Sequence, residues 1–387
     1  MKILMLAPEP FFQPRGTPIS VYFRIRALAD LGHEVDLVTY PLGSDAPLPN
    51  HRVFRVPNVL GLRSIKIGPS PAKLPLDALL FLRAAGRLLI GRYDIIFTHE
   101  EAALIGAVLG RISGVPHIYD MHSSLPQQLS NFDFSRSSLL RGIFVAMENF
   151  YLKRSQAVIV ICRDLLDKVT RDGCGGKAHL IENVLEFPSD PVTPDEVARL
   201  KKECAPGGER IVLYAGNFQR YQGIGLLLEA AARVKDKAVF VLVGGTGADL
   251  EAMNRKAAEL GIAGKAVFVD KVPPSRVALY LELADVLVSP RLAGTNTPLK
   301  IYSFLKSGKP LVATNLWTHT QILDGRIAVL VEPEAEALAR GIAFALNDPE
   351  AGRRARAAKA MADRDYTRER YTEKIRLCLE TALGGRR

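Results

Sequence analysis

The chain has 387 residues, a formal net charge of +10 and 24% charged residues. This length exceeds one ordinary hydrophobic core, so we expect two domains of about 150–200 residues each. The positive charge permits acidic small molecules, anionic lipid surfaces or nucleic acid as partners. The sequence has no RNP-like aromatic strand, zinc-finger spacing or concentrated Lys/Arg tract, so nucleic acid is not expected among them.

The four cysteines indicate neither a metal site nor a disulfide framework, because they are scattered without C-x-x-C spacing or nearby histidine pairs. The apolar stretch ILMLA near the N-terminus is cut short by Pro8 and Pro10 and is too short for a signal-peptide core. The other apolar runs end well before the roughly 18 residues that a membrane span needs. We therefore expect a cytoplasmic protein.

The first half of the chain alternates short apolar strands with helices. Residues 2–10 are typical of a buried strand, and a loop with Gly16 leads into an amphipathic helix that ends at Gly32. A strand follows, and the next predicted elements are strands near 94–98 and 116–120 around a helix near 101–112. Short apolar strands separated by helices predict a parallel, doubly wound sheet.

A second series of the same kind follows the proline-rich, acidic stretch PSDPVTPDE. Its predicted strands cover 210–218, 238–247, 266–272, 285–290 and 310–315. We therefore expect an α/β protein with two Rossmann-like, doubly wound domains that face each other across a cleft. The predicted bounds are 1–187 and 188–364, and a basic amphipathic helix within 365–387 is expected to pack back on the first domain.

The stretch SPRLAGTNTPLKIYSFLKSGKP, residues 289–310, has strong helix-start chemistry. Thr297 is predicted to cap a helix whose first residue is Pro298, which would leave the amides of Thr297, Leu299 and Lys300 free. A helix start is a ready phosphate site, and Arg291 and Lys300 add two charges nearby. The alternative is an ordinary capped helix with solvated cations. Its place after a strand end, where such sheets bind ligands, favours phosphate.

Two glycine-containing loops also follow predicted strands. Gly216 comes directly after one strand, with Gly223 before a helix, and Gly244 and Gly245 lie in LVGGTG after another. Such loops let the backbone approach a pyrophosphate without a Cβ in the way. Turns need glycine as often, and neither loop is a full G-x-G-x-x-G.

Titratable side chains gather at two strand ends of the first half. Asp120 and His122 follow one strand in YDMHSS, and His99, Glu100 and Glu101 follow another. A lone histidine is more often structural, but strand-end loops are where substrate contacts gather, so we favour a functional role for Asp120 and His122. Glu101 has a simpler explanation as the start of the next helix.

Residues 61–92 interleave leucine, isoleucine and phenylalanine with arginines and lysines. A surface helix that covers the sheet explains this pattern. Peripheral contact with an anionic membrane is the second interpretation, because basic amphipathic segments lie on such surfaces.

Over nearly its whole length the chain resembles the GT-B fold glycosyltransferases, specifically the retaining family 4. The resemblance is carried by YDMHS, IENV, LYAGNFQRYQGIGLLLEAA, FVLVGGTG and AVFVDKVPPSRVALYLELADVLVSP, which leads into PLKIYSFLKSGKPLVAT. It implies transfer of a hexosyl group from a nucleotide-diphosphate sugar, UDP- or GDP-linked, to a glycan or lipid-linked acceptor. It also implies retained anomeric configuration, no metal and no further cofactor.

The resemblance also implies positions for the donor. Its diphosphate would lie on the helix start at Thr297–Lys300 and near the Gly16 loop, and its sugar near His122. The base would lie against the backbone around Lys271 and Val272.

Four family positions differ in this chain. The usual E-x7-E pair is replaced by Thr295 and Ser303, and the usual Arg and Lys of the Gly216 loop are replaced by Asn217 and Gln222. Losing the second glutamate removes a charge-assisted hydrogen bond to the ribose, worth roughly 1.5–3 kcal/mol. Our hypothesis is that Arg220, Arg291 and Lys300 restore the positive site.

Two other functions stay open. A non-catalytic homologue that binds sugar nucleotide or glycan as a partner subunit would explain the missing side chains. A sugar-nucleotide epimerase would need carboxylates poised for acid–base work, for which Glu100 and Glu101 are the obvious candidates.

Overall fold

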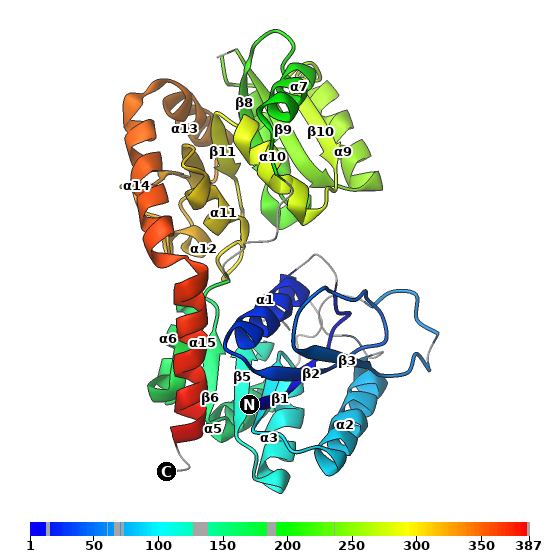
Figure 1. The fold of residues 1–387 in the computed structure, drawn as a ribbon. Helices are drawn as coiled ribbons and strands as arrows, with labels where there is room; N and C mark the ends of the chain where they lie inside the picture. Colours follow the sequence, from blue (N-terminus) through cyan, green and yellow to red (C-terminus); the bar gives the residue numbers. More distant parts are fainter. Residues whose placement is uncertain are drawn as a thin grey trace. The chain divides into compact units, whose positions relative to one another are not determined.

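The computed structural model describes residues 1–12, 16–59, 61–65, 70, 73–126, 138–183, 191–235 and 237–384. The chain forms two compact units (Figure 1). Unit 1 comprises Met1–Asn183 together with Arg368–Arg387, and unit 2 comprises Val184–Thr367. The last helix of the chain therefore belongs to the same unit as the N-terminus. Among the described residues, no helix is long and apolar enough to cross a membrane.

Unit 1 is built on a seven-stranded parallel sheet in the order β3-β2-β1-β4-β5-β6-β7. Its strands are β1 (Lys2–Ala7), β2 (Glu34–Thr39), β3 (His51–Arg55), β4 (Ile95–His99), β5 (His117–Met121), β6 (Ala157–Val160) and β7 (Ala178–Leu180). Its helices are α1 (Gly16–Asp30), α2 (Lys73–Ile90), α3 (Ala102–Ser113), α5 (Ser138–Arg154), α6 (Arg163–Arg171), the 3-10 turn η1 (Gly175–Lys177) and α15 (Arg368–Leu383).

Helices cover both faces of this sheet, which explains why its central strands are almost wholly apolar. Right-handed crossovers that run from β3 through β4, β5 and β6 to β7 place α2, α3, α5 and α6 on one face. The crossover from β1 to β2 runs the other way and places α1 on the opposite face, where it contacts α15. Of the basic segment 61–92, residues 66–69, 71 and 72 lie outside the described residues, and 73–90 form α2.

Unit 2 is built on a six-stranded parallel sheet in the order β10-β9-β8-β11-β12-β13. Its strands are β8 (Arg210–Ala215), β9 (Ala238–Gly245), β10 (Ala266–Asp270), β11 (Val286–Ser289), β12 (Leu311–Thr314) and β13 (Val329–Val331). Its helices are α7 (Pro194–Cys204), η2 (Arg220–Gln222), α8 (Ile224–Ala231), α9 (Gly247–Glu259), η3 (Pro274–Arg276), α10 (Val277–Leu283), α11 (Lys300–Ser307), α12 (Trp317–Thr320), α13 (Ala335–Asn347) and α14 (Pro349–Asp365).

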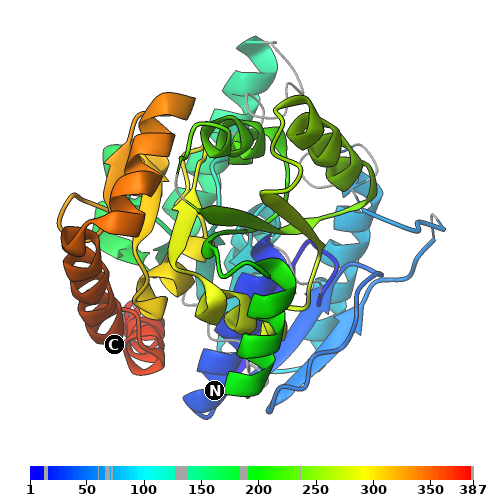
Figure 2. The same ribbon diagram turned by 90° about the horizontal axis from the view of Figure 1, so that it is seen from above.

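The unit 2 sheet also has a hydrophobic core on each face. Along β8, Ile211 and Leu213 pack with α10, α11 and α14, whereas Val212 and Tyr214 pack with α8 and α13. This alternation follows from the two-residue period of a strand. Figures 1 and 2 show helices on both sides of the unit 2 strands. The predicted architecture of two Rossmann-like parallel sheets is confirmed.

Candidate active site

The helix predicted in SPRLAGTNTPLKIYSFLKSGKP begins later than its sequence suggests. α11 starts at Lys300, Leu299 occupies the N-cap position, and no side chain caps the helix. The prediction that Thr297 caps a helix starting at Pro298 is therefore wrong. The physical reason lies in distant side chains that bind the carbonyls of this segment: Thr318 Oγ1 donates to Asn296 O (2.6 Å) and Gln321 Nε2 to Thr295 O (2.6 Å).

Thr297 nevertheless has an unusual environment. Its side chain is buried, and its hydroxyl makes no hydrogen bond to any described residue. A buried hydroxyl without a partner costs free energy, so Thr297 is a candidate ligand group even though it is not a cap. Gly308 ends the helix, with the left-handed backbone (φ +68°) that favours glycine.

Arg291 lies just after β11 and is held from several sides. Its Nη1 donates to Asn296 O and to Thr318 Oγ1, both at 2.8 Å, and its guanidinium carbon lies 5.0 Å from the ring centroid of Tyr221. Its Nε is buried and has no partner among the described residues. Burial lowers the pKa of Arg291. One edge of the guanidinium therefore fixes the loop, and Nε remains available to a ligand.

Lys300, the first residue of α11, directs its ammonium into the same region. Nζ lies 3.8 Å from the ring centroid of Tyr214 and donates to Gln222 Oε1 at 3.3 Å. Burial, and then the positive charge of Arg291, hold the pKa of Lys300 well below its usual value. In the part of unit 2 that the structure describes, no carboxylate compensates either cation. An anion placed here would relieve an unfavourable pair of charges.

The two glycine loops pack against this cation. A Cβ on Gly216 would lie 2.7 Å from Lys300 Nζ, and a Cβ on Gly244 would lie 2.4 Å from the carbonyl oxygen of Gly216. Both residues also have positive φ, +147° and +114° respectively. Glycine is thus required at both positions to bring the ends of β8 and β9 together beside Lys300. A Cβ on Gly245 would meet Leu250 and Phe218, so that glycine serves core packing.

Of the substituted family positions, Ser303 and Asn217 make contacts within their own segments. Ser303 Oγ donates to Lys300 O (2.9 Å), a bond within its own helix, and Asn217 Oδ1 accepts from Gln219 N (3.2 Å). Gln222 is buried, and its side-chain oxygen is the acceptor for Lys300. Of the three cations predicted to restore the positive site, the structure brings Arg291 and Lys300 to one loop region.

The remaining predicted donor positions are spread over unit 2 and unit 1. Arg220, the third predicted cation, is exposed on η2. Lys271 is also exposed after β10, where its amide donates to Asp270 Oδ1 (2.9 Å), while Val272 packs against the core. Gly16 is the first residue of α1 rather than part of a preceding loop, with φ +38°.

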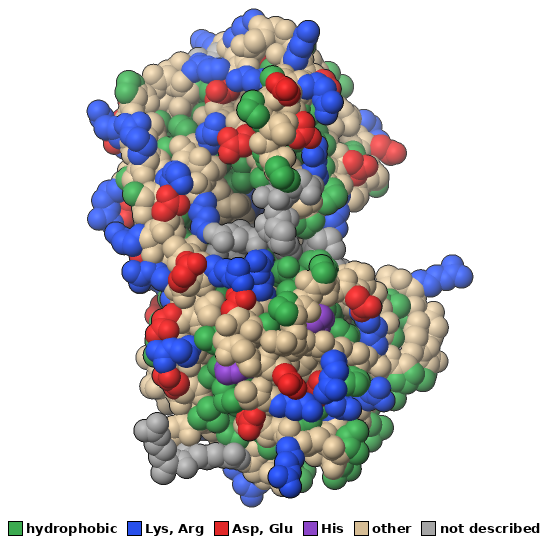
Figure 3. All heavy atoms as spheres, in the orientation of Figure 1, with side chains coloured by type: hydrophobic (Ala, Val, Ile, Leu, Met, Phe, Trp, Pro, Cys, Tyr) green, Lys and Arg blue, Asp and Glu red, His purple; other side chains and the backbone are tan. Residues whose placement is uncertain are grey.

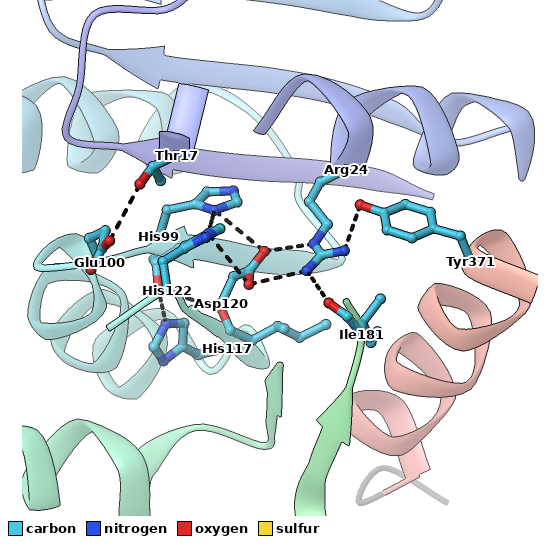
Figure 4. A network of polar contacts seen from close by, with 11 residues as sticks. Thr17, Arg24, His99, Glu100, His117, Asp120, His122, Ile181 and Tyr371 are labelled. Atoms are coloured by element: carbon cyan, nitrogen blue, oxygen red, sulfur yellow. Dashed lines mark hydrogen bonds and ion pairs between the residues drawn. The ribbon is translucent and has the colours of Figure 1, made fainter. Parts of the chain in front are cut away.

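In unit 1, His99, Asp120 and His122 form one polar cluster at the carboxyl ends of β4 and β5 (Figure 4). His99 Nδ1 lies 3.1 Å from His122 Nε2, and each histidine has a nitrogen 3.5 Å from an oxygen of Asp120. Burial lowers the pKa of His99 to about 3, so this imidazole is neutral at physiological pH. His122 is 5% exposed, whereas His99 and Asp120 are fully buried.

Behind this cluster stands Arg24 of α1, which the sequence analysis missed. Its Nε donates to Asp120 Oδ2 at 2.7 Å, Nη1 to the hydroxyl of Tyr371 at 2.5 Å, and Nη2 to Ile181 O at 3.1 Å (Figure 4). Burial alone would raise the pKa of Asp120, but the guanidinium of Arg24 outweighs burial and keeps it well below its usual value. Asp120 therefore acts as a permanent carboxylate that fixes the two histidines.

The same three residues have the chemistry of metal ligands, since their ligating atoms all lie within 4.8 Å of one another. The arrangement does not suit a metal ion, because Arg24 already approaches both oxygens of Asp120, at 2.7 and 3.4 Å. A dication bound by Asp120 would be repelled by this fully buried guanidinium. The geometry favours a positioning network for His122.

Glu100 and Glu101 differ in their surroundings. Glu100 has a left-handed backbone (φ +48°) and accepts from Ser123 Oγ at 3.0 Å and Thr17 Oγ1 at 3.4 Å. Burial raises its pKa to about 7. Glu101 forms an ion pair with Lys73 Nζ at 2.8 Å. Glu100 is thus a carboxyl group that can change protonation near neutral pH.

Two family models together match most of the chain. The model described as "Glycosyl transferase 4-like domain" matches residues 20–183, and the model described as "Glycosyl transferases group 1" matches residues 198–363. The chain belongs to the family 4 glycosyltransferases of the GT-B fold. The resemblance noted from the sequence is confirmed, and so is its consequence that the protein is a glycosyltransferase.

Similar proteins add detail about the kinds of glycosyltransferase in this family. The enzyme is 25% identical over 379 residues to the phosphatidyl-myo-inositol mannosyltransferase of Mycolicibacterium smegmatis, covering 95% of this chain and 91% of that protein. It is 24% identical over 359 residues to the D-inositol 3-phosphate glycosyltransferase of Acidothermus cellulolyticus, covering 86% of this chain and 78% of that one.

A solved structure of Anabaena HepE in complex with UDP has the same fold. Its TM-score is 0.76 at 18% identity, and the match covers 98% of this chain and all of HepE. At 18% identity this likeness shows the fold of this chain and says nothing of the ligands that it binds.

Proposed function

We propose that this glycosyltransferase moves a hexosyl group from a UDP- or GDP-linked sugar to a glycan or lipid-linked acceptor, with retained anomeric configuration and without a metal ion. The observation that carries the proposal is the pair of partly buried cations, Arg291 and Lys300, with no carboxylate partner in the described part of unit 2. They lie at the ends of parallel strands, where ligands of such sheets bind.

The chemistry requires stabilisation of the leaving group. The acceptor oxygen forms a bond to the anomeric carbon of the sugar while the bond from that carbon to the diphosphate oxygen breaks. The acceptor proton passes to a diphosphate oxygen of the donor, so no enzymic nucleophile is needed. Negative charge grows on the diphosphate, and cations held in place beforehand, such as Lys300 and Arg291, stabilise that charge.

Three features support this assignment of the diphosphate site. Lys300 supplies a cation beside Gln222, where the family usually has a lysine. Gly216 and Gly244 keep the neighbouring backbone free of side-chain atoms, which a diphosphate needs for close approach. Arg291 Nε and the hydroxyl of Thr297 are buried and lack partners among the described residues, so a ligand could satisfy both.

The acceptor side of the proposal involves unit 1. We infer that His122 contacts the sugar or acceptor and that Asp120 and His99 orient its ring. Related enzymes named for phosphatidyl-myo-inositol and D-inositol 3-phosphate support an acceptor that carries hydroxyl groups next to a phosphate.

A binding experiment tests the donor site. We expect one of UDP, GDP, ADP and dTDP to stabilise the protein against heat in the presence of EDTA, by about 2.7 kcal/mol at 100 times its Kd. Lys300→Met should lose this stabilisation, because it keeps the side-chain volume but removes the charge. Lys201→Met, which changes an exposed lysine of α7, is the matched control and should bind normally.

Sugar transfer tests the reaction itself. Detectable transfer or donor hydrolysis that is lost in Arg291→Ala and Lys300→Ala supports the proposal, and undiminished turnover in these variants contradicts it. If no nucleotide binds a well-folded protein, the non-catalytic alternative is favoured. Ser303 then explains the loss, because its hydroxyl bonds to its own helix and this position has no carboxylate for the ribose. Product formed without any acceptor would instead indicate an epimerase.

A further inference from the structure

The segment that carries Arg291 and Thr297 has no regular structure of its own. Residues 290–299 connect β11 to α11 and form neither helix nor strand. The carbonyls of such a segment have no partners within a helix or sheet, so other parts of the chain must supply them. Side chains that follow β12 do so here. We call residues 289–297 the anchored segment.

Three side chains of the stretch 314–321 donate hydrogen bonds to backbone carbonyls of the anchored segment. The bonds are Thr314 Oγ1 to Arg291 O (2.7 Å), Thr318 Oγ1 to Asn296 O (2.6 Å) and Gln321 Nε2 to Thr295 O (2.6 Å). They come from the end of β12, from α12 and from the residue after α12. The end of β12 and α12 together therefore fix the path of the anchored segment.

His319 fixes α12 itself to the ends of two strands. Its ring is fully buried, with Nδ1 2.9 Å from Thr314 O and Nε2 2.8 Å from Ser289 Oγ. A carbonyl oxygen can only accept, so Nδ1 carries the proton and Nε2 accepts from the Ser289 hydroxyl. Burial lowers the pKa of His319 to about 4, so the ring is neutral at physiological pH. α12 is thus a rigid support for the side chains next to His319.

Thr318 differs from the other two donors because it also contacts a charged side chain. Its hydroxyl accepts from Arg291 Nη1 at 2.8 Å and donates to Asn296 O, and Arg291 Nη1 donates to the same carbonyl at 2.8 Å. The three groups form a closed triangle of hydrogen bonds, and Thr318 is fully buried. The triangle holds one end of the guanidinium, and this determines where Nε points.

The partners that orient Arg291 are all uncharged. On the surface of unit 2, by contrast, several arginines pair with carboxylates, namely Arg326 with Asp324, Arg340 with Glu336 and Arg353 with Glu350. Figure 3 shows such basic and acidic side chains next to one another on the face of unit 2 that it draws. A carboxylate in place of the Thr318 hydroxyl would also hold Arg291, but it would neutralise its charge. Thr318 fixes the guanidinium and leaves its charge to a ligand.

We propose that Thr318 is a positioning residue for diphosphate binding, because its hydroxyl orients the Arg291 guanidinium before the donor arrives. A free arginine side chain loses rotamer freedom when it binds a ligand, and a guanidinium that is already held avoids this loss. The inference rests on the proposed function, which assigns the donor diphosphate to Arg291 and Lys300. It adds that α12, on which the sequence predicted no donor contact, contributes to donor affinity.

Calorimetric titration with UDP and with GDP, in the presence of EDTA, measures the effect on affinity. Thr318→Val keeps the branched shape but removes the hydroxyl, and it should raise the Kd about tenfold. Thr318→Ser keeps the hydroxyl and should recover most of the affinity. Thr320→Val makes the same change as Thr318→Val on the same helix, and it should bind like wild type. In an Arg291→Ala background, Thr318→Val should weaken binding no further.

A second measurement follows the guanidinium without any nucleotide. ¹⁵N relaxation of the Arg291 Nε–H signal, assigned by its loss in Arg291→Ala, gives the order parameter of this group. The order parameter should fall in Thr318→Val and recover in Thr318→Ser. An unchanged order parameter in Thr318→Val would overturn the inference. Urea unfolding of each variant shows that the compared proteins are folded.

Failure of this inference can be distinguished from failure of the proposed function. Normal binding by Thr318→Val together with weakened binding by Arg291→Ala would overturn the role of Thr318 and leave the diphosphate site in place. Binding by Arg291→Ala that is as tight as in wild type would instead contradict the proposed function. A loss in Thr318→Val that is equally large with and without Arg291 would also overturn the inference, since Thr318 would then not act through the guanidinium.

Discussion

The ammonium nitrogen of Lys300 lies 3.3 Å from the side-chain oxygen of Gln222. In the family that this chain belongs to, the position of Gln222 usually carries the lysine that contacts the donor diphosphate. A cation from the start of α11 thus stands next to the place of the missing one. The positive charge is therefore at position 300 of the sequence and not at position 222, but it lies in the same region of the structure.

The first prediction concerns the effect of Lys300 on stability. Its pKa in the folded state lies well below its usual value because of burial and then Arg291. Between that lowered pKa and about 10.4, the unfolded chain binds more protons than the folded one, so stability rises with pH across this window. Urea unfolding as the pH is raised towards 10 should show this rise in wild type and a smaller rise in Lys300→Met. Parallel curves for both proteins would contradict the lowered pKa, and Lys201→Met serves as control.

The second prediction restores a missing carboxylate. Ser303 lies on α11, and its hydroxyl donates a hydrogen bond to the carbonyl oxygen of Lys300. Ser303→Glu should increase nucleoside diphosphate affinity about tenfold, since a charge-assisted hydrogen bond to the ribose contributes roughly 1.5–3 kcal/mol. Calorimetric titration of UDP and GDP measures the change, and Ser303→Gln, which lacks the charge, should gain less. Weaker binding in Ser303→Glu would mean that the new carboxylate neutralises Lys300 instead.

The strands could be predicted from sequence because each is a short apolar run bounded by turn residues. The predicted 94–98 and 116–120, for example, are observed as Ile95–His99 and His117–Met121. The start of α11 could not, because Thr318 and Gln321, more than 20 residues further on, bind the carbonyls of Asn296 and Thr295. Local capping propensity at Thr297 is overridden by these contacts.

The interactions that hold Asp120 could not be predicted from the sequence either. Arg24 is 96 residues away from Asp120 along the chain and Tyr371 is 347 residues away from Arg24, so no local pattern connects them. The available signal was the composition of this stretch, in which Arg24 is the one charged residue from Pro18 to Ile25; all of these residues are buried in the structure. A fully buried arginine requires an acidic partner.

The third prediction distinguishes two reasons why a glycine is needed, close packing against neighbouring backbone and a strained backbone conformation, by their effects on stability. Gly244 and Gly247 both have positive φ, +114° and +41°, but a Cβ on Gly244 would lie 2.4 Å from Gly216 O, whereas a Cβ on Gly247 would meet nothing within 4 Å. Gly247→Ala should cost about 1–2 kcal/mol from strain alone. Gly244→Ala should cost more and also lose nucleotide binding, because the Gly216 loop must move away from Lys300. Equal losses of stability in the two variants, measured by urea unfolding, would contradict this packing.

The fourth prediction concerns the buried pair of Arg24 and Asp120. Arg24→Met should lower the free energy of unfolding by about 3–5 kcal/mol, because it leaves the Asp120 carboxylate buried without its cation. Tyr371→Phe, which removes one acceptor of Arg24, should cost about 1–3 kcal/mol.

The double variant Arg24→Met with Asp120→Asn decides whether the loss comes from an unpaired charge. It should be more stable than Arg24→Met alone, because neither side chain then carries a buried charge, and the double-mutant cycle gives the coupling between the two residues. Additive losses would show that each side chain acts separately. Because Asp120 also faces His99 and His122, the double variant should lose sugar transfer even where stability returns. Recovery of both together would mean that Asp120 serves the fold and not the orientation of His122.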